Sequence, residues 1–102
     1  MAQVITVFRS RLRDDVSDEY FALADRLHDR ATRIEGFVEQ KVFVAEDGER
    51  LTLVVFDSEA AHDQWRHDPV HHAAQQRGRD EFYEEYDIAV AEAERRHTWR
   101  HA

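Results

Sequence analysis

The dipeptide Asp47-Gly48 constrains the fold of this chain more than any other pair of residues. It lies in a short polar link between two runs rich in β-branched and aromatic residues, Phe37–Ala45 and Arg50–Asp57. Asp-Gly readily adopts the positive φ angles that tight hairpin turns require, so this pattern is a strong β-hairpin signal. We therefore expect the two runs to pair as neighbouring antiparallel strands.

The remaining elements follow from hydrophobic periodicity. Residues Val4–Leu12 alternate in character with the period of a strand. Ser17 is a good N-cap for a helix that carries an apolar stripe at helical spacing and ends at Gly36. Residues Phe82–Glu92 alternate again and predict a last strand. This alternation places Tyr83 and Tyr86 on opposite faces, so we expect only one of them to face the helices.

The region between the hairpin and the last strand predicts a broken helix. Ser58 can cap a short helix to about Arg66, and the Asp68-Pro69 step disfavours its continuation. Pro69 suits the first turn of another helix, which we expect to run to about Glu81.

The resulting order, β-α-β-β-α-β, predicts an α+β fold of the ferredoxin-like split type, a four-stranded antiparallel sheet with helices on one face. The uncovered face carries both apolar and charged residues, either Ile5, Val7 and Arg9 or their opposite-phase neighbours. Because apolar sheet surface needs a cover, we expect this face to pack on a second subunit.

Composition limits the partners. A chain of 102 residues predicts one domain, residues 1–102, with a thin core that a homodimer would reinforce. A formal net charge of −8 argues against nucleic acid and anionic membrane surfaces. The absence of cysteine excludes a disulfide or thiolate, and no apolar leader is apparent, so we expect a cytoplasmic protein. The polar tail, residues 94–102, is interpreted as a strand extension or as an arm that reaches a partner.

Residues 65–75 hold the side chains best suited to chemistry. Trp65 is either a core residue or a platform for a planar ligand. His71 and His72 lie early in the predicted second part of the broken helix, where the helix dipole favours neutral, base-competent imidazole. Gln75 and Arg79 follow His71 at helical spacing, so the three could present a proton acceptor, an amide and a cation to a ligand oxygen. The alternative is a solvated polar face.

A metal site is a further alternative for the histidines. His62, His67, His71 and His72 are close in sequence. However, Pro69 interrupts the helical spacing between them, and no HExxH motif, cysteine pair or carboxylate-rich loop accompanies them. We therefore predict no metal site.

The combined pattern resembles the antibiotic biosynthesis monooxygenase (ABM) domain of the dimeric α+β barrel superfamily. The resemblance covers almost the whole chain. It is carried by the run from Phe43 to Val54, by Phe56, Glu59, Trp65-Arg66, His67-Asp68-Pro69-Val70-His71 and Gln75, and by Gly78-Arg79, Phe82-Tyr83 and Tyr86. It implies a homodimer of ferredoxin-like subunits, each with a pocket between its helices and its sheet. The activities it implies include cofactor-independent oxidation of polycyclic phenols to quinones, oxidative haem breakdown, and turnover of quinols or signal molecules.

Two positions depart from branches of that family. The haem-degrading branch has an iron-ligating histidine ten residues after the helical tryptophan, where this chain has Gln75. We therefore expect no axially ligated haem, with ligation by His71 or His72 from a neighbouring turn as the alternative. The polyketide-oxidising branch has an asparagine four residues before that tryptophan, where this chain has Ala61.

These observations predict a small oxygenase that acts without a cofactor on a planar aromatic, phenolic or quinol molecule. His71 or His72 would act as general base and Arg79 would stabilise the anion. Trp65, Gln75, Phe8 and Tyr86 are the predicted substrate contacts. The alternative is a non-catalytic dimeric module that binds an aromatic or haem-like ligand.

Overall fold

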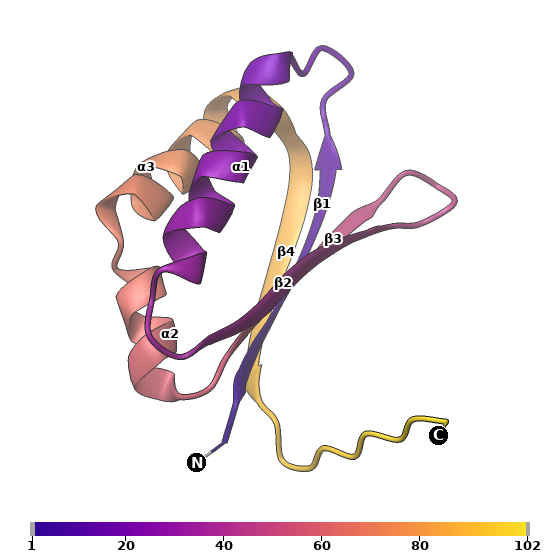
Figure 1. Ribbon diagram of the computed structural model, residues 1–102. Helices are drawn as coiled ribbons and strands as arrows, with labels where there is room; N and C mark the ends of the chain where they lie inside the picture. The colour runs from indigo at the N-terminus through magenta and orange to yellow at the C-terminus, as the bar shows by residue number, and fades with distance from the viewer. Residues whose placement is uncertain (1, 102) are drawn as a thin grey trace.

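The computed structural model describes residues 2–101. It consists of one layer of helices packed on one β-sheet. The elements are β1 (Val4–Leu12), α1 (Asp18–Thr32), β2 (Phe37–Val44), β3 (Arg50–Phe56), α2 (Glu59–Arg66), α3 (Pro69–Arg77), the π-helical turn η1 (Gly78–Phe82) and β4 (Tyr83–Glu92). The sheet has the order β2-β3-β1-β4, and every neighbouring pair is antiparallel. The helices lie on one side of it (Figure 1). The predicted α+β ferredoxin-like fold is confirmed.

Local signals in the sequence fix most element boundaries. The hydroxyl oxygens of Ser17 and Ser58 accept backbone N–H groups at the starts of α1 and α2, as their N-cap positions predict. Gly36 and Gly48 have φ angles of 100° and 88°, which strongly favour glycine. At Gly36 a Cβ would also collide with Ala61, so this turn tolerates no side chain. The predicted hairpin is therefore observed, whereas α1 ends at Thr32, before the turn at Gly36.

The helix after Pro69 is shorter than expected. Regular α-helix ends at Arg77, and the π-helical turn Gly78–Phe82 replaces the continuation to Glu81. The ring of Tyr83 packs directly against Gly78, where a Cβ would overlap it. The wider turn buries Phe82 and interrupts the α-helical spacing beyond Gln75.

Two β-bulges change which side chains face the helices. In β2, Phe37 pairs with Phe56 and Gln40 pairs with Val54, so one extra residue lies between them. In β4, Tyr83 pairs with Leu12, but the preceding residue of β1 pairs two positions further along β4. One extra residue of β4 therefore lies between these two pairs. An extra residue reverses the alternation of faces along a strand.

The second bulge corrects an expectation about β4. Tyr86 pairs with Ser10 and Tyr83 pairs with Leu12, and these two partners lie on the same face of β1. Tyr83 and Tyr86 therefore share the helix-facing side, and their rings lie 5.8 Å apart. The prediction that they occupy opposite faces is wrong, because strict alternation fails across a bulge.

The buried core joins the sheet to α1 and α2. It consists of Ala31, Val54, Phe56, Ala61 and Trp65, with Leu27, Ile34 and Phe37 packed against it. Trp65 is 8% exposed, so its role as a core residue is observed. The opposite face of the sheet carries half-buried Ile5 and Val7 and the exposed Arg9–Glu49 ion pair. No helix of the described residues packs on that face (Figure 1).

The tail after β4 runs away from the body of the molecule (Figure 1). It forms no strand through residue 101, so the strand extension is not observed. Trp99, in this tail, is 74% exposed. No helix among residues 2–101 is both long and apolar enough to span a membrane.

Candidate active site

A cavity of about 480 Å³ lies between the helices and the helix-facing side of the sheet. Its volume is in the range typical of small-molecule sites. Six of the predicted site residues line it, namely Phe8, Trp65, His71, His72, Gln75 and Tyr86. The sheet supplies an apolar floor that includes Val42, Val54, Ile88 and Val90. The cavity therefore has an apolar floor, and many of its other lining residues carry polar side chains.

His71 is the best-positioned proton acceptor in this cavity. Its ring stacks on the indole of Trp65, with 4.1 Å between ring centroids and 18° between planes. Its Nδ1 lies 3.3 Å from the carbonyl oxygen of Trp65. Because a carbonyl can only accept, Nδ1 carries the proton, and Nε2 of the neutral ring keeps its lone pair.

Burial sets the protonation state of His71. Desolvation lowers the pKa of His71 below that of an ordinary histidine, since the charged imidazolium loses hydration in this position. The imidazole is therefore neutral at neutral pH, and its free Nε2 can accept a proton. This is the state that a general base requires.

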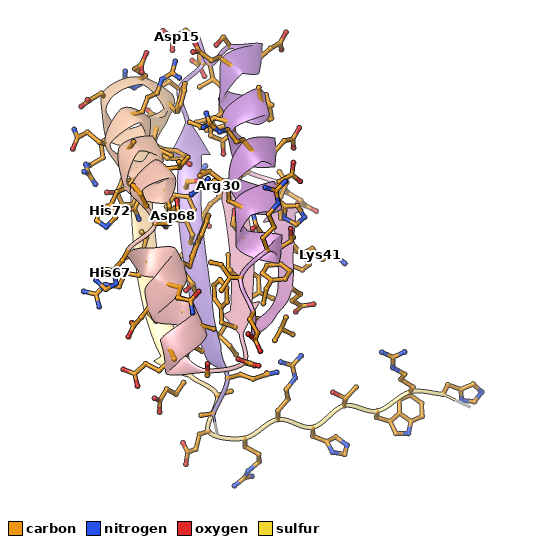
Figure 2. All side chains as sticks on the ribbon, turned by 60° about the vertical axis from the view of Figure 1, so that its left-hand side comes forward. Asp15, Arg30, Lys41, His67, Asp68 and His72 are labelled. Carbon is orange, nitrogen blue, oxygen red and sulfur yellow. The ribbon has the colours of Figure 1, made fainter. Side chains whose placement is uncertain are left out.

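Asp68 fixes the position of His71. Its Oδ1 accepts the backbone N–H groups of Val70 and His71, at 2.9 and 3.0 Å, and so caps α3. Its Oδ2 accepts a 2.7 Å hydrogen bond from Nη2 of Arg30 on α1. Figure 2 shows Asp68 and Arg30 meeting between the two helices. One carboxylate thus starts the helix that carries His71 and links that helix to α1.

The ion pair with Arg30 predicts an acid-sensitive contribution to stability. Arg30 lowers the pKa of Asp68, so this carboxylate stabilises the fold above the pKa of an unfolded aspartate, about 3.9. That contribution is lost as the pH falls through the lower native pKa. Replacing Asp68 with Ala should cost about 1–2 kcal/mol at pH 7, mainly by loss of the cap, and less near pH 2. Urea unfolding at both pH values measures this. The exposed Asp25→Ala variant is the control, and an equal loss at both pH values would refute the linkage.

The other cavity histidines are placed differently. His72 is exposed and projects outward at the rim, as does His67, whose Nδ1 lies 2.8 Å from the Asp63 carbonyl (Figure 2). His62 lies edge-on to Phe56, and burial lowers the pKa of His62. Among residues 2–101, no three histidine or carboxylate side chains are grouped closely enough to hold a metal ion.

Arg79 does not line the cavity directly. Its Nη1 donates a 3.0 Å hydrogen bond to the Tyr86 hydroxyl, and its Nη2 donates to Gln76. The π-helical turn interrupts the spacing that would have kept Arg79 on the face of His71 and Gln75. The arginines that do line the cavity are Arg50 of β3 and Arg66 of α2.

An aromatic cluster forms the end of the cavity near η1. The ring of Phe8 contacts those of Tyr83 and Tyr86, with centroids 5.4 and 5.5 Å apart. Tyr20 of α1 packs edge-on against Tyr83 and Phe82. Burial strongly raises the pKa of Tyr83, so this phenol stays neutral.

Sequence reasoning missed several cavity residues, among them Tyr20, Gln40 and Arg50, and it considered His62 only as a metal ligand. Arg50 could have been found, because it is four residues before Val54 and so two strand periods from a core position. Gln40 gave no such signal, because the bulge in β2 reverses its face relative to Phe37. Ala61, at the position of the family asparagine, lies in the core cluster and not in the cavity wall.

Residues 3–77 match the model of the antibiotic biosynthesis monooxygenase family. YqjZ of Bacillus subtilis, an uncharacterised protein, is 30% identical over 94 residues, which cover 92% of this chain and 82% of YqjZ. The jasmonate monooxygenase of Pyricularia oryzae is 30% identical over 88 residues, 84% of this chain but 41% of that protein. This chain belongs to the antibiotic biosynthesis monooxygenase family, as its resemblance predicted.

Solved structures share the fold at lower identity. A Mycobacterium tuberculosis protein superposes with a TM-score of 0.80 at 18% identity, covering 94% of this chain and 99% of its own. SnoaB, a cofactor-independent oxygenase from Streptomyces nogalater, gives a TM-score of 0.75 at 15% identity, covering 94% and 97%. These similarities establish the ferredoxin-like α+β architecture for this chain.

Proposed function

We propose that this protein is a cofactor-independent monooxygenase that oxidises a planar phenol or quinol in the cavity beside His71. The observation that carries this proposal is the neutral His71 ring, with Nδ1 held by the Trp65 carbonyl and Nε2 left as a base. Membership of the monooxygenase family supports oxygenation as the reaction class. So do the names of two similar proteins, a cofactor-independent oxygenase and a jasmonate monooxygenase.

The chemistry needs only substrate and O2. His71 removes the phenolic proton, and the phenolate transfers one electron to O2. The resulting superoxide and phenoxyl radical combine at the para carbon, and the imidazolium returns its proton to the peroxide oxygen. Loss of the C–H proton from that carbon then breaks the O–O bond and forms the second carbonyl. The released hydroxide takes this proton, so a phenol with a free para C–H and one O2 give a quinone and one water.

The other cavity residues bind the substrate. The apolar floor and the rings of Phe8 and Tyr86 offer a planar aromatic molecule an apolar contact surface. Arg79 donates to the Tyr86 oxygen, so the Tyr86 O–H proton is free to hydrogen-bond the substrate anion. In this proposal Arg79 acts through Tyr86 as a positioning residue, while Trp65 and Gln75 contribute walls of the cavity.

Turnover of simple phenols tests the proposal. Chelator-treated protein is incubated with 1-naphthol under air, and O2 uptake is compared with formation of 1,4-naphthoquinone. One quinone for each O2, abolished under nitrogen and absent in heat-denatured protein, is the expected result. Tight binding of hydroxynaphthalenes without any oxidation would favour the alternative, a non-catalytic module that binds aromatic ligands.

We also propose a homodimer formed by the uncovered face of the sheet. Light scattering at micromolar concentration should give twice the 12.1 kDa chain mass, with more than about 1,200 Å² buried in the complex. Replacing half-buried Val7 of this face with Glu should shift the mass towards the monomer, because a charge would be buried in the interface. Ala22→Glu, on the exposed side of α1, should leave the mass unchanged. A monomeric wild-type protein at this concentration would refute the proposal.

A further inference from the structure

Gln40 carries a buried amide oxygen that has no hydrogen-bond partner in the described chain. Its side chain comes from β2 and lines the cavity. Buried polar atoms in folded proteins are nearly always paired, and an unpaired one destabilises the fold. Such an exception in the wall of a ligand cavity calls for a physical reason.

The bulge in β2 is what directs Gln40 to this position. Phe37 faces the helices and packs on Phe56, and strict alternation would turn Gln40 to the opposite face. The extra residue places Gln40 beside Val54 instead, on the helix-facing side. Bulges often re-aim a side chain next to an active site. The fold therefore places an amide at a position where an apolar side chain would be more stable.

The residues around Gln40 supply no hydrogen-bond donor to its amide oxygen. Val54 is its neighbour on β3, and Val42 follows on the same side of β2. The sheet also brings the hydroxyl groups of Thr6 and Thr52 to the cavity, and neither hydrogen-bonds the amide oxygen. The terminal torsion of a glutamine side chain is soft, so a small rotation can turn this oxygen towards a bound molecule. A donor carried by the ligand is the partner that the site lacks.

We propose that Gln40 determines specificity by accepting a hydrogen bond from a second hydroxyl group on the substrate. This inference rests on the proposed function and narrows the substrate class. His71 removes the proton of one hydroxyl group, and Gln40 accepts a hydrogen bond from another. The substrate class is then a fused aromatic with hydroxyl groups on different rings, rather than a simple phenol. A site built to pair a hydroxyl discriminates strongly against analogues that lack it.

Anaerobic binding tests the inference without relying on oxidation. The Trp99→Phe variant leaves Trp65 as the sole tryptophan, whose fluorescence reports on the cavity. The probes are 1-naphthol, its 1,5-, 1,6- and 1,7-dihydroxy analogues, and the methyl ether of the second hydroxyl in the analogue that binds best. We expect that dihydroxynaphthalene to bind about 5- to 50-fold more tightly than both 1-naphthol and the ether, which keeps the oxygen but cannot donate.

Gln40→Leu should abolish this preference and leave 1-naphthol bound as tightly as before, or more tightly. Gln64→Leu makes the same change at an exposed position of α2 and should keep the preference. Gln75→Leu removes the other amide that lines the cavity. A preference that survives in Gln40→Leu, or that is lost in Gln75→Leu alone, overturns the assignment. So does equal binding of all the probes by the wild-type cavity.

Stability without ligand gives a second readout. If Gln40 serves the ligand, Gln40→Leu should raise the melting temperature of the unliganded protein by a few degrees, because an unpaired buried amide is replaced by an apolar side chain. A purely structural role predicts a lower melting temperature instead and would contradict the proposal. If the preference depends on Gln40 but no probe is oxidised under air, the specificity role stands and the monooxygenase proposal fails.

Discussion

His71→Ala should lower the turnover rate of a phenolic substrate by about 10²–10⁴-fold, the usual contribution of a positioned general base. The ring of His71 is stacked on Trp65, and His71 lines the cavity. An exposed histidine therefore does not readily take over its role as the base. Single-turnover oxidation under saturating substrate measures the chemical step directly. The variant should keep the mass of the wild-type protein, because His71 lies far from the uncovered face of the sheet.

His72→Ala is the matched control for this prediction. It removes an imidazole from the next position of the same helix, where the side chain is exposed at the rim. We expect a change of no more than a few-fold. Similar losses in both variants would show that histidine substitutions disturb α3 generally. Negligible losses in both would assign proton removal to the substrate's own acidity or to another residue.

The pH profile separates the base from a structural histidine. The base is active when neutral, so kcat/KM should rise with pH and level off above the pKa of His71. Because burial lowers that pKa, the midpoint should lie below about 6.5, the ordinary value for histidine. His71→Ala should remove this limb of the profile while His72→Ala preserves it.

Trp65→Ala should destabilise the fold by about 3–5 kcal/mol, a large share of the total stability of a domain of this size. Its indole is 8% exposed and packs in the core cluster with Val54 and Phe56. Its ring also supports the ring of His71, so activity should fall even in the fraction that remains folded. Urea unfolding followed by circular dichroism measures the loss of stability.

Trp99→Ala provides the control for the same substitution. Trp99 is 74% exposed in the tail, so its removal should change the free energy of unfolding by less than about 0.5 kcal/mol. Trp65→Phe should fall between the two, since a smaller ring retains part of the packing and of the stack on His71. If Trp65→Ala proves as stable as Trp99→Ala, the core role of the indole is wrong.

The corrections to the sequence interpretation share a physical origin. The opposite faces predicted for Tyr83 and Tyr86 and the predicted position of Arg79 were both extrapolated along one element by a fixed period. A bulge or a wide helical turn adds a residue, so the side chains beyond it point to a different face than the fixed period predicts. Whether one occurs depends on the partner strand or on a ring packed from elsewhere, such as Tyr83 against Gly78.

The sequence by itself determined the order of elements, the hairpin at Asp47-Gly48 and the helix caps, because each depends on residues a few positions apart. It also placed Trp65, His71 and Gln75 in one region of the molecule. Only the tertiary structure decided which polar groups face the cavity and which nitrogen of His71 is free. The reason is that strand register, ring stacking and burial join residues far apart in the chain, and no local pattern encodes them.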